Sequence, residues 1–251
     1  IYRERKRKQA LIDDKYLERI DNTIKIINDF TAKKVDYIVF HNNEWMGGTS
    51  ATKELFDNTI DCGELYRKVD VKKIGDAFID TSIEQVIFSS FAKGYKDLAI
   101  YLKTENTNLK IKTYWHGSHS QVLETYGFFR NVEIINLHKK GIVDVMATCK
   151  ESLLNFYLKE GYKAKFITNK VPTDIKPINK KKSKVIKIGL YAANCNYWRK
   201  NMFTQIAAVS LLDNVVIDMV PVNDTALEFA KILGVKIEGV ASSLKREDLI
   251  K

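Results

Sequence analysis

The sequence is poor in cysteine and proline and has no long apolar segment. Its three cysteines, Cys62, Cys149 and Cys195, lie far apart in a chain of 251 residues. Their spacing predicts neither a disulfide framework nor a zinc finger, and reduced thiols are typical of cytoplasmic proteins. No apolar run approaches the ~18–20 residues that a membrane-spanning helix needs. We therefore expect a cytoplasmic protein rather than a disulfide-rich secreted domain or an integral membrane protein.

Several signatures of nucleotide and metal sites are also missing. The chain has no G-x-G-x-x-G after a strand, no G-x-x-x-x-G-K-[ST] phosphate loop and no G-x-S-x-G nucleophile elbow. It has no D-x-D pair of the kind that holds a metal ion beside a diphosphate. His116 and His119 lie three residues apart, but the glutamate of a metalloprotease helix does not accompany them. We expect neither a metal ion nor a bound cofactor.

Positive charge, by contrast, is abundant. The 41 basic and 31 acidic residues give a formal net charge of +10, which favours an anionic partner. Two basic runs, at 3–8 and 179–184, carry much of this excess, and such runs are commonly solvated tails or linkers. The first run could bring the protein to an acidic membrane surface, where each cation contributes about 1 kcal/mol. Nucleic-acid binding is an alternative explanation, but we find no aromatic–basic platform for it and expect no nucleic-acid partner.

Strand-like and helix-like segments alternate along most of the chain. Residues 1–33 have apolar residues at helical spacing, which predicts a helical extension, or a linker to a neighbouring catalytic module in a longer polypeptide. From residue 34 to 172, strands such as "KVDYIVF" and "EQVIFSS" alternate with helices such as "KGYKDLAIYLKTE". This alternation is typical of a parallel sheet that helices cover on both faces.

A polar segment with two of the three prolines interrupts the alternation, which then resumes with three further strands. A doubly wound domain usually has five or six strands, so the second domain is predicted to be small or truncated. The sequence thus predicts an α/β fold with two Rossmann-like domains, at 34–172 and within 173–251.

The loop after the first predicted strand contains several candidate functional residues. His41 ends that strand, Glu44 follows, and the Gly47-Gly48 pair comes before a predicted helix for which Thr49 or Ser50 can act as the N-cap. In open parallel sheets, ligands bind at the carboxyl ends of strands. A glycine pair before a helix lets backbone N–H groups approach an anion closely. This loop therefore predicts one side of a diphosphate site.

Two further loops carry candidates of the same kind. His116-Gly117 follows a later strand and precedes a predicted helix. Arg199 and Lys200 lie after the first strand of the second predicted domain, at the start of its first helix. Cationic and N–H-rich loops from two domains are typical of a site for a nucleotide diphosphate.

Taken together, these features resemble GT-B glycosyltransferases, and most of all glycosyltransferase family 4. Gly47-Gly48 matches the glycine pair that faces the donor diphosphate, and His116-Gly117 resembles the H-G or H-D step at which the histidine reaches the donor sugar. "IVDVMATCKESLLNFYLKEGYKAKFITNKVP" is similar to the passage that closes the family's first domain. "KIGLYAANCNYWRKNMFTQIAAV" resembles the opening of its second domain, where Lys200-Asn201 matches a diphosphate-gripping lysine. The resemblance covers about residues 34–251.

The chain departs from the family pattern at three places. The Asn-Gly step at the domain boundary is Asn169-Lys170, and the usual place of the diphosphate arginine is Asn194, with Arg199 close to the lysine instead. The glutamate pair that holds the donor ribose would lie beyond Lys251 in the family's order. The donor half of the predicted cleft is therefore incomplete.

The resemblance implies two Rossmann-like domains that face each other across a cleft, with 34–172 on the acceptor side and 173–251 as the start of the nucleotide-sugar-binding domain. It implies metal-independent transfer of a hexose from a nucleotide-diphosphate sugar to a glycan or lipid-linked acceptor, as in polysaccharide biosynthesis. A nucleotide-sugar epimerase with a GT-B-like fold is the alternative enzyme, and a structural role at a turn or helix end is the alternative for each histidine. The candidate catalytic residues are His116, His41 and Glu44, and the candidate donor- and diphosphate-binding residues are Gly47, Gly48, Gly117, Arg199 and Lys200.

Overall fold

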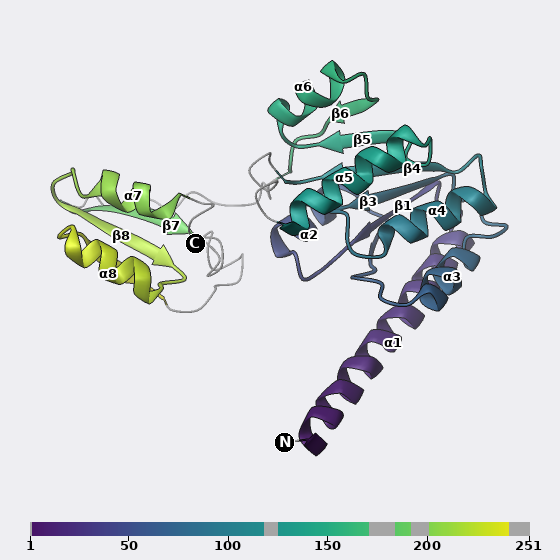
Figure 1. Cartoon of the computed structure of the whole chain (residues 1–251), viewed down its shortest axis with the longest axis horizontal. Helices are drawn as coiled ribbons and strands as arrows, with labels where there is room; N and C mark the ends of the chain where they lie inside the picture. Colours follow the sequence, from purple (N-terminus) through teal and green to yellow (C-terminus); the bar gives the residue numbers. More distant parts are fainter. Residues whose placement is uncertain (1, 118–124, 171–183, 192–200, 241–251) are drawn as a thin grey trace. The chain divides into compact units, whose positions relative to one another are not determined.

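The computed structural model describes residues 2–117, 125–170, 184–191 and 201–240. The chain divides into two compact units, Ile1–Pro172 and Thr173–Lys251, which we call unit 1 and unit 2 (Figure 1). The candidate residues Arg199 and Lys200, and also His119, lie outside the described residues.

Unit 1 contains a six-stranded parallel sheet with the order β2-β1-β3-β4-β5-β6. This architecture confirms the α/β class and the parallel sheet that the alternation of segments predicted. The strands are β1 (Tyr37–His41), β2 (Thr59–Asp61), β3 (Gln85–Ser89), β4 (Lys110–Trp115), β5 (Val145–Thr148) and β6 (Ala164–Phe166). The helices are α1 (Tyr2–Ala32), α2 (Met46–Leu55), α3 (Lys68–Asp76), α4 (Tyr95–Glu105), α5 (Thr125–Lys139) and α6 (Glu151–Lys159).

The order of the strands reverses at β1. β2 pairs with one side of β1 and β3 with the other, so the chain first moves in one direction across the sheet and then in the opposite direction. Because crossovers between parallel strands are right-handed, α2 covers one face of the sheet, and α3, α4 and α5 cover the other. In open α/β sheets, ligands bind at such a reversal, which here lies at the carboxyl ends of β1 and β3.

Two elements of unit 1, β2 and α3, are not predicted by the sequence pattern. β2 has only three residues, which is too short for an alternating pattern, and its pairing with β1 makes it a strand. The sequence of α3, "KVDVKKIGD", contains two β-branched valines and a glycine, so its helical propensity is low. Val71 and Ile74 are buried, and this tertiary packing stabilises the helix.

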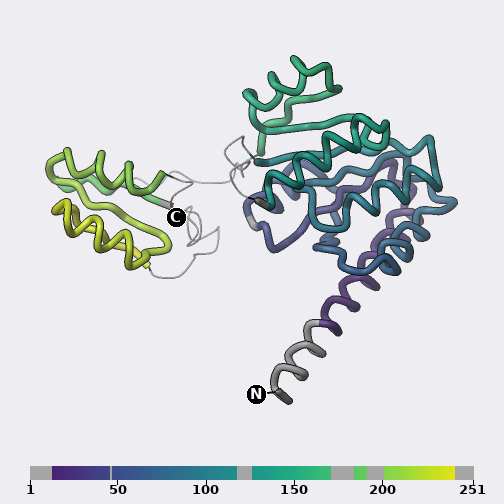
Figure 2. The backbone as a smooth tube through the Cα atoms, viewed as in Figure 1, coloured from purple at the N-terminus to yellow at the C-terminus, as the bar shows by residue number. Residues whose placement is uncertain are grey.

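The second half of α1 belongs to the core of unit 1. Ile20, Thr23 and Ile27 recur at helical spacing and are buried. This half of the helix contacts α3 and β2, and the tube view shows it running close to α3 (Figure 2). The core therefore includes helical residues that precede the predicted domain boundary at residue 34.

A buried carboxylate fastens α1 to α3. Asp70 accepts hydrogen bonds from Tyr16 Oη at 2.8 Å and from Nε and Nη2 of Arg67 at 2.6 and 2.8 Å. Burial alone would raise the pKa of the Asp70 carboxyl, but the hydrogen bonds from Arg67 and Tyr16 outweigh it, and the pKa is lowered. The carboxylate is thus charged at neutral pH, and its partners are Tyr16 of α1 and Arg67, the residue directly before α3.

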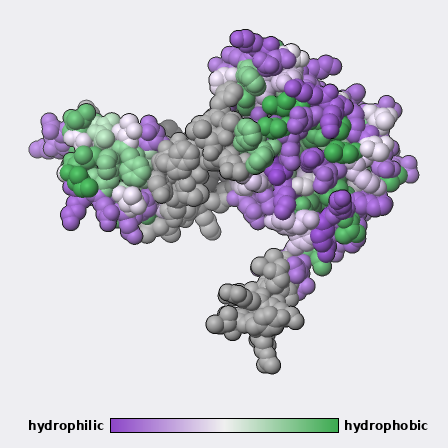
Figure 3. Space-filling view, viewed as in Figure 1, coloured by the Kyte–Doolittle hydropathy of each residue, from purple (hydrophilic) through white to green (hydrophobic). Residues whose placement is uncertain are grey.

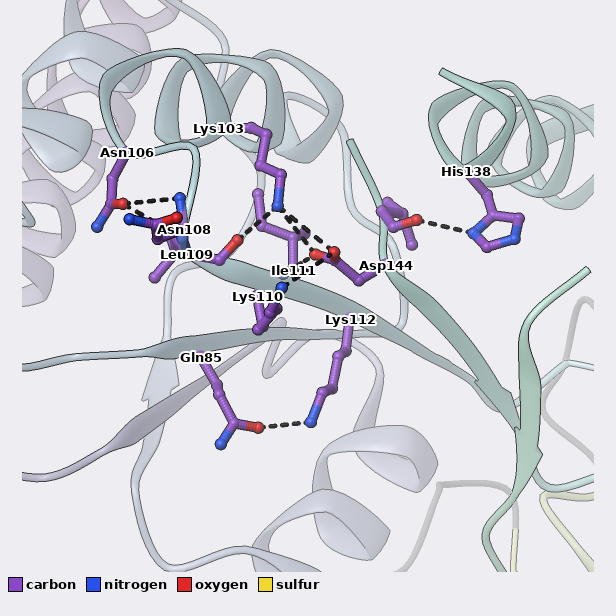
Figure 4. Close-up of polar contacts among 11 residues, drawn as sticks. Gln85, Lys103, Asn106, Asn108, Leu109, Lys110, Ile111, Lys112, His138 and Asp144 are labelled. Atoms are coloured by element: carbon purple, nitrogen blue, oxygen red, sulfur yellow. Dashed lines mark hydrogen bonds and ion pairs between the residues drawn. The ribbon is translucent and has the colours of Figure 1, made fainter. Parts of the chain in front are cut away.

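The amino ends of β4 and β5 are joined by a second carboxylate, Asp144. It accepts from the Ile111 backbone N–H at 2.8 Å and pairs with Lys103 at 3.1 Å (Figure 4). In the same view, Lys112 and Gln85 meet on the other face of the sheet, away from Asp144. These contacts fix the register at the edge of the sheet opposite to the carboxyl ends.

Unit 2 is a smaller α/β unit with a three-stranded parallel sheet in the order β7-β8-β9. Its described core, which includes Leu190, Ile206, Ile217 and Met219, lies between the sheet and the two helices. The strands are β7 (Ile186–Tyr191), β8 (Val215–Val220) and β9 (Lys236–Gly239), and the helices are α7 (Met202–Val209) and α8 (Asp224–Ile232). The three strands predicted for this part of the chain are present.

Hydrophilic residues cover most of the face of unit 1 that the space-filling view presents (Figure 3). Within the described residues, no helix combines the length and the apolar character required to cross a membrane. Cys62 and Cys149 are free thiols.

The packing of α1 leads to a stability prediction. Ile27 is fully buried, so Ile27→Ala should lower the free energy of unfolding by about 2–5 kcal/mol through lost burial and a residual cavity. Lys25→Ala, on the exposed face of the same helix, should change it by less than about 0.5 kcal/mol. Urea unfolding, followed by tryptophan fluorescence, measures both. Equal unfolding midpoints for the two variants would show that α1 is not part of the core.

Candidate functional site

The carboxyl ends of β1, β3 and β4 lie side by side at the reversal of the sheet. The register pairs Phe40 of β1 with Phe88 of β3, and Ser89 of β3 with Tyr114 of β4. The loops after these three strands therefore begin at the same edge. The candidate residues at the end of β1 and after it, from His41 to Gly48, and those after β4, His116 and Gly117, therefore lie at the same edge of the sheet.

His116 follows β4 directly and is half-buried. Its Nε2 atom lies 2.8 Å from Ser89 Oγ, and its Nδ1 atom lies 3.2 Å from Oδ1 of Asn169. Ser89 Oγ is 2.6 Å from Oγ1 of Thr52, which donates a hydrogen bond of 2.7 Å to the carbonyl oxygen of Gly48. A continuous chain of polar contacts thus connects α2, β3, the end of β4 and the segment after β6.

Asn169 and Tyr114 hold the imidazole from its other side. Tyr114 is buried, and its Oη lies 2.7 Å from Asn169 Oδ1 and 3.1 Å from the carbonyl oxygen of Ile167. The rings of Tyr114 and His116 have centroids 4.2 Å apart. His116 is therefore contacted at both nitrogens and on its face, which fixes the position of the ring.

The surroundings keep His116 uncharged. Burial lowers its pKa to about 4, the hydrogen bond with Asn169 opposes this shift, and the positive charge of Lys150 adds to it. At pH 7 the ring is therefore neutral, with one nitrogen that donates and one that accepts.

Helix α2 begins earlier than the sequence suggests, which corrects the predicted position of the glycine pair. The helix starts at Met46 rather than after an N-cap at Thr49 or Ser50, so Gly47 and Gly48 lie in its first turn and not in a loop before it. The early start follows from a turn in which Trp45 N donates to the Asn42 carbonyl at 3.0 Å. The first N–H groups of any α-helix have no intrahelical acceptor, and at α2 the side chain of the N-cap residue Trp45 does not supply one.

The two glycines are not equivalent. A Cβ atom at Gly48 would lie 2.8 Å from Ser90 Oγ and 3.5 Å from Cδ2 of His116, whereas a Cβ atom at Gly47 would have no atom within 4 Å. Gly48 therefore permits the close approach between α2 and the residues that follow β3 and β4. Gly47 has no such steric role.

His41 is enclosed at the end of β1. It is 2% exposed, and its carbonyl oxygen accepts from Tyr95 Oη at 2.9 Å and from the backbone N–H groups of Cys62 and Gly63. Burial lowers its pKa to about 4; the charge of Asp61 opposes the shift, and that of Lys53 adds to it. A catalytic base must come within ~3 Å of the hydroxyl it deprotonates. The burial of His41 favours the structural alternative for this residue.

Glu44 has the exposure that His41 lacks. Its side chain is exposed, and its backbone N–H donates to Oδ1 of Asn42 at 3.0 Å, which fixes the turn before α2. Gly117 is half-buried beside His116 and is the last residue described before the gap at 118–124.

Thr52 and Asn169 join the candidate site although neither stands in a recognised catalytic motif. Thr52 lies one helical turn after Gly48, and only the tertiary structure brings its hydroxyl to Ser89. Asn169 stands in the sequence as one half of the Asn-Lys step at the predicted domain boundary, but its contact with His116 spans 53 residues.

Two hollows of unit 1 lie away from this edge. One, of about 350 Å³, lies at the amino ends of β3 and β4 and is lined by residues such as Phe78, Thr81 and Leu109. The other, of about 300 Å³, lies between α3 and α4 and includes Lys72 and Tyr101. Among the residues that the structure describes, no three His, Cys, Asp or Glu side chains are grouped so that they could hold a metal ion.

No model of a known protein family matches the chain, and no curated protein matches it either. The candidate site therefore rests on the geometry and chemistry of its own residues.

The low pKa values of His41 and His116 predict acid sensitivity. The unfolded chain takes up these two protons near pH 6.5 and the folded chain only near pH 4, so acidification between these values favours unfolding. The stability present above pH 6.5 should fall as the pH is lowered towards 4. Urea unfolding of the wild type and of His116→Gln across this range measures the effect. A His116→Gln variant with an unreduced pH dependence would contradict the assignment.

The difference between the two glycines can also be measured. Gly47→Ala should raise the free energy of unfolding by about 0.5–1 kcal/mol, because alanine is the better helix former and its Cβ meets open space. Gly48→Ala should lack this gain, because its Cβ displaces the Ser90 hydroxyl. The double variant Gly48→Ala/Ser90→Ala should recover it. Equal stabilisation by the two single variants would show that Gly48 has no steric role.

Proposed function

We propose that the protein is a glycosyltransferase that moves a hexose from a nucleotide-diphosphate sugar to a glycan or lipid-linked acceptor and requires no metal ion. One observation carries the proposal. At the reversal of the sheet, the start of α2, which has no side-chain cap, lies close to His116, a neutral imidazole whose two ring nitrogens contact Ser89 and Asn169. A second α/β unit and the family resemblance of the motifs support it.

In this proposal the first turn of α2 receives the donor diphosphate. Backbone N–H groups and the positive end of the helix dipole favour a phosphate oxygen, and Gly47 and Gly48 present no side chain at this point. By the family resemblance, Arg199 and Lys200 of 173–251 are our candidates for the positive charge that stabilises the departing diphosphate. Gly117 adds no side chain next to His116, which contacts the sugar in this proposal.

The transfer itself forms one bond and breaks one. The acceptor oxygen forms a bond to the anomeric carbon, and the bond from that carbon to the diphosphate oxygen breaks with its electron pair. The acceptor proton passes to a carboxylate, for which exposed Glu44 is our candidate, or to the departing diphosphate. The protein contributes by orienting the reactants and stabilising the departing charge.

The proposal extends to the surroundings of the protein. We place it in the cytoplasm, with residues 34–172 on the acceptor side and 173–251 on the donor side. The basic run at 3–8 would bring a lipid-linked acceptor within reach by contact with an acidic membrane surface.

Nucleotide release measures the activity. The protein is incubated with UDP-, GDP- and dTDP-hexoses in the presence of EDTA, with and without a mixture of oligosaccharide acceptors. We expect one donor to be hydrolysed slowly and consumed faster with acceptor. His116→Ala should lower the rate by at least about tenfold, because it removes the contact to the sugar.

His119→Ala is the matched control, since it removes an imidazole three residues away that has no part in the proposal. Conversion of the donor into an isomeric nucleotide sugar without acceptor would identify an epimerase instead. If no donor binds or is consumed, the proposed function is wrong.

A further inference from the structure

The number of available protons determines which nitrogen of His116 carries a hydrogen. The carbonyl oxygen of Gly48 can only accept, so at 2.7 Å the single proton of the Thr52 hydroxyl must point to it. Thr52 Oγ1 then has only lone pairs to offer to Ser89. At 2.6 Å, Ser89 must therefore donate its own proton to Thr52.

The same reasoning continues to the ring. With its proton committed to Thr52, Ser89 Oγ can only accept from His116, whose Nε2 lies 2.8 Å away. The hydrogen of the neutral imidazole is thus on Nε2, and Nδ1 carries a lone pair. The opposite direction would leave the contact between Thr52 and the Gly48 carbonyl without a proton.

Asn169 must match this arrangement. A lone pair on Nδ1 requires a donor, whereas Oδ1 of Asn169 can only accept. A half-turn of the amide exchanges Oδ1 and Nδ2 in nearly the same positions and brings an N–H to Nδ1. As a donor, the amide stabilises the neutral ring, so it no longer opposes the lowering of the His116 pKa by burial. Tyr114 then accepts from Asn169 and donates to the carbonyl of Ile167, so the contacts of Tyr114 and of His116 Nδ1 have one proton each.

We propose that Thr52 and Ser89 are positioning residues that fix His116 as the Nε2–H tautomer, and that the Asn169 amide covers the remaining Nδ1 lone pair. Asn169 is exposed, so a ligand reaches Nδ1 from this side by taking the place of the amide. A lone pair selects a ligand group that donates a hydrogen bond. His116 therefore binds a hydroxyl and not a deprotonated phosphate oxygen, a consequence that rests on the proposed function.

His138 provides an internal reference of the opposite kind. Its Nδ1 lies 2.7 Å from the carbonyl oxygen of Val143 (Figure 4). Its Nε2 accepts from the backbone N–H of Lys163 at 3.2 Å. The ring must therefore carry its hydrogen on Nδ1. The two residues should show opposite tautomers in one sample.

Long-range ¹H–¹⁵N correlation spectra of the uniformly ¹⁵N-labelled full chain at pH 7 distinguish the tautomers. The signals of His116 and His138 are assigned by their loss in His116→Gln and His138→Gln. We expect a protonated Nε2 and an unprotonated Nδ1 for His116, and the reverse for His138. A protonated Nδ1 at His116 in the wild type would overturn the proposal.

Thr52→Val tests whether the Thr52 hydroxyl, acting through Ser89, determines which nitrogen of His116 carries the hydrogen. Without the Thr52 hydroxyl, Ser89 donates to Nε2, and the hydrogen of His116 should move to Nδ1, opposite Oδ1 of Asn169. Thr49→Val is the matched control, because this hydroxyl lies on the same helix and donates to the Asn42 carbonyl at 2.7 Å but does not contact Ser89. The control should leave the His116 signals unchanged.

Ser89→Ala gives a second route if Thr52→Val does not fold. It removes the acceptor of the Nε2 hydrogen, and the signals should shift towards the Nδ1–H form. A variant that folds and keeps the wild-type tautomer would show that the chain of hydroxyls does not position His116. Because the spectra contain no nucleotide sugar, their outcome is independent of whether the protein transfers a hexose.

Discussion

The end of β1 is the point on which the rest of unit 1 depends. β1 pairs with β2 on one side and β3 on the other, and its last carbonyl oxygen, that of His41, accepts from Tyr95 Oη and from two backbone N–H groups. Beneath it, the rings of Phe40, Phe88 and Tyr95 pack with centroid distances between 5.0 and 6.3 Å. β1 stops at these contacts, the turn at Asn42 then sets where α2 starts, and the start of α2 places Gly48 against the residues that follow β3 and β4.

Polar groups at this edge are held in a fixed order because few protons are available to them. Thr52, Ser89 and His116 have one hydrogen each to give, and the Gly48 carbonyl has none. Burial keeps the imidazole neutral and thereby excludes a second ring proton at neutral pH. The direction of the whole chain of contacts thus follows from one carbonyl group and from the desolvation of one ring.

Away from the candidate site, two carboxylates hold the sheet and its covering helices in place. Asp70 joins α1 to α3 through Tyr16 and Arg67, and Asp144 joins β4 to β5 and to Lys103 of α4. Asp70 is fully buried, so its charge is stable only because three hydrogen-bond donors surround it.

The sequence by itself determined the α/β class, the parallel sheet and the strand ends at which His41 and His116 lie, because these follow from local periodicity and from which residues end each strand. The tertiary structure decided what local patterns do not contain. β2 and α3 exist because neighbouring strands and helices pack on them, and α2 begins at Met46 because of a turn set by Asn42. His41 is buried whereas His116 is only half-buried, and a Cβ atom would clash at Gly48 but not at Gly47. The partners of His116, from Thr52 to Asn169, lie 64 and 53 residues away along the chain, and such contacts arise only when the sheet brings its strand ends together.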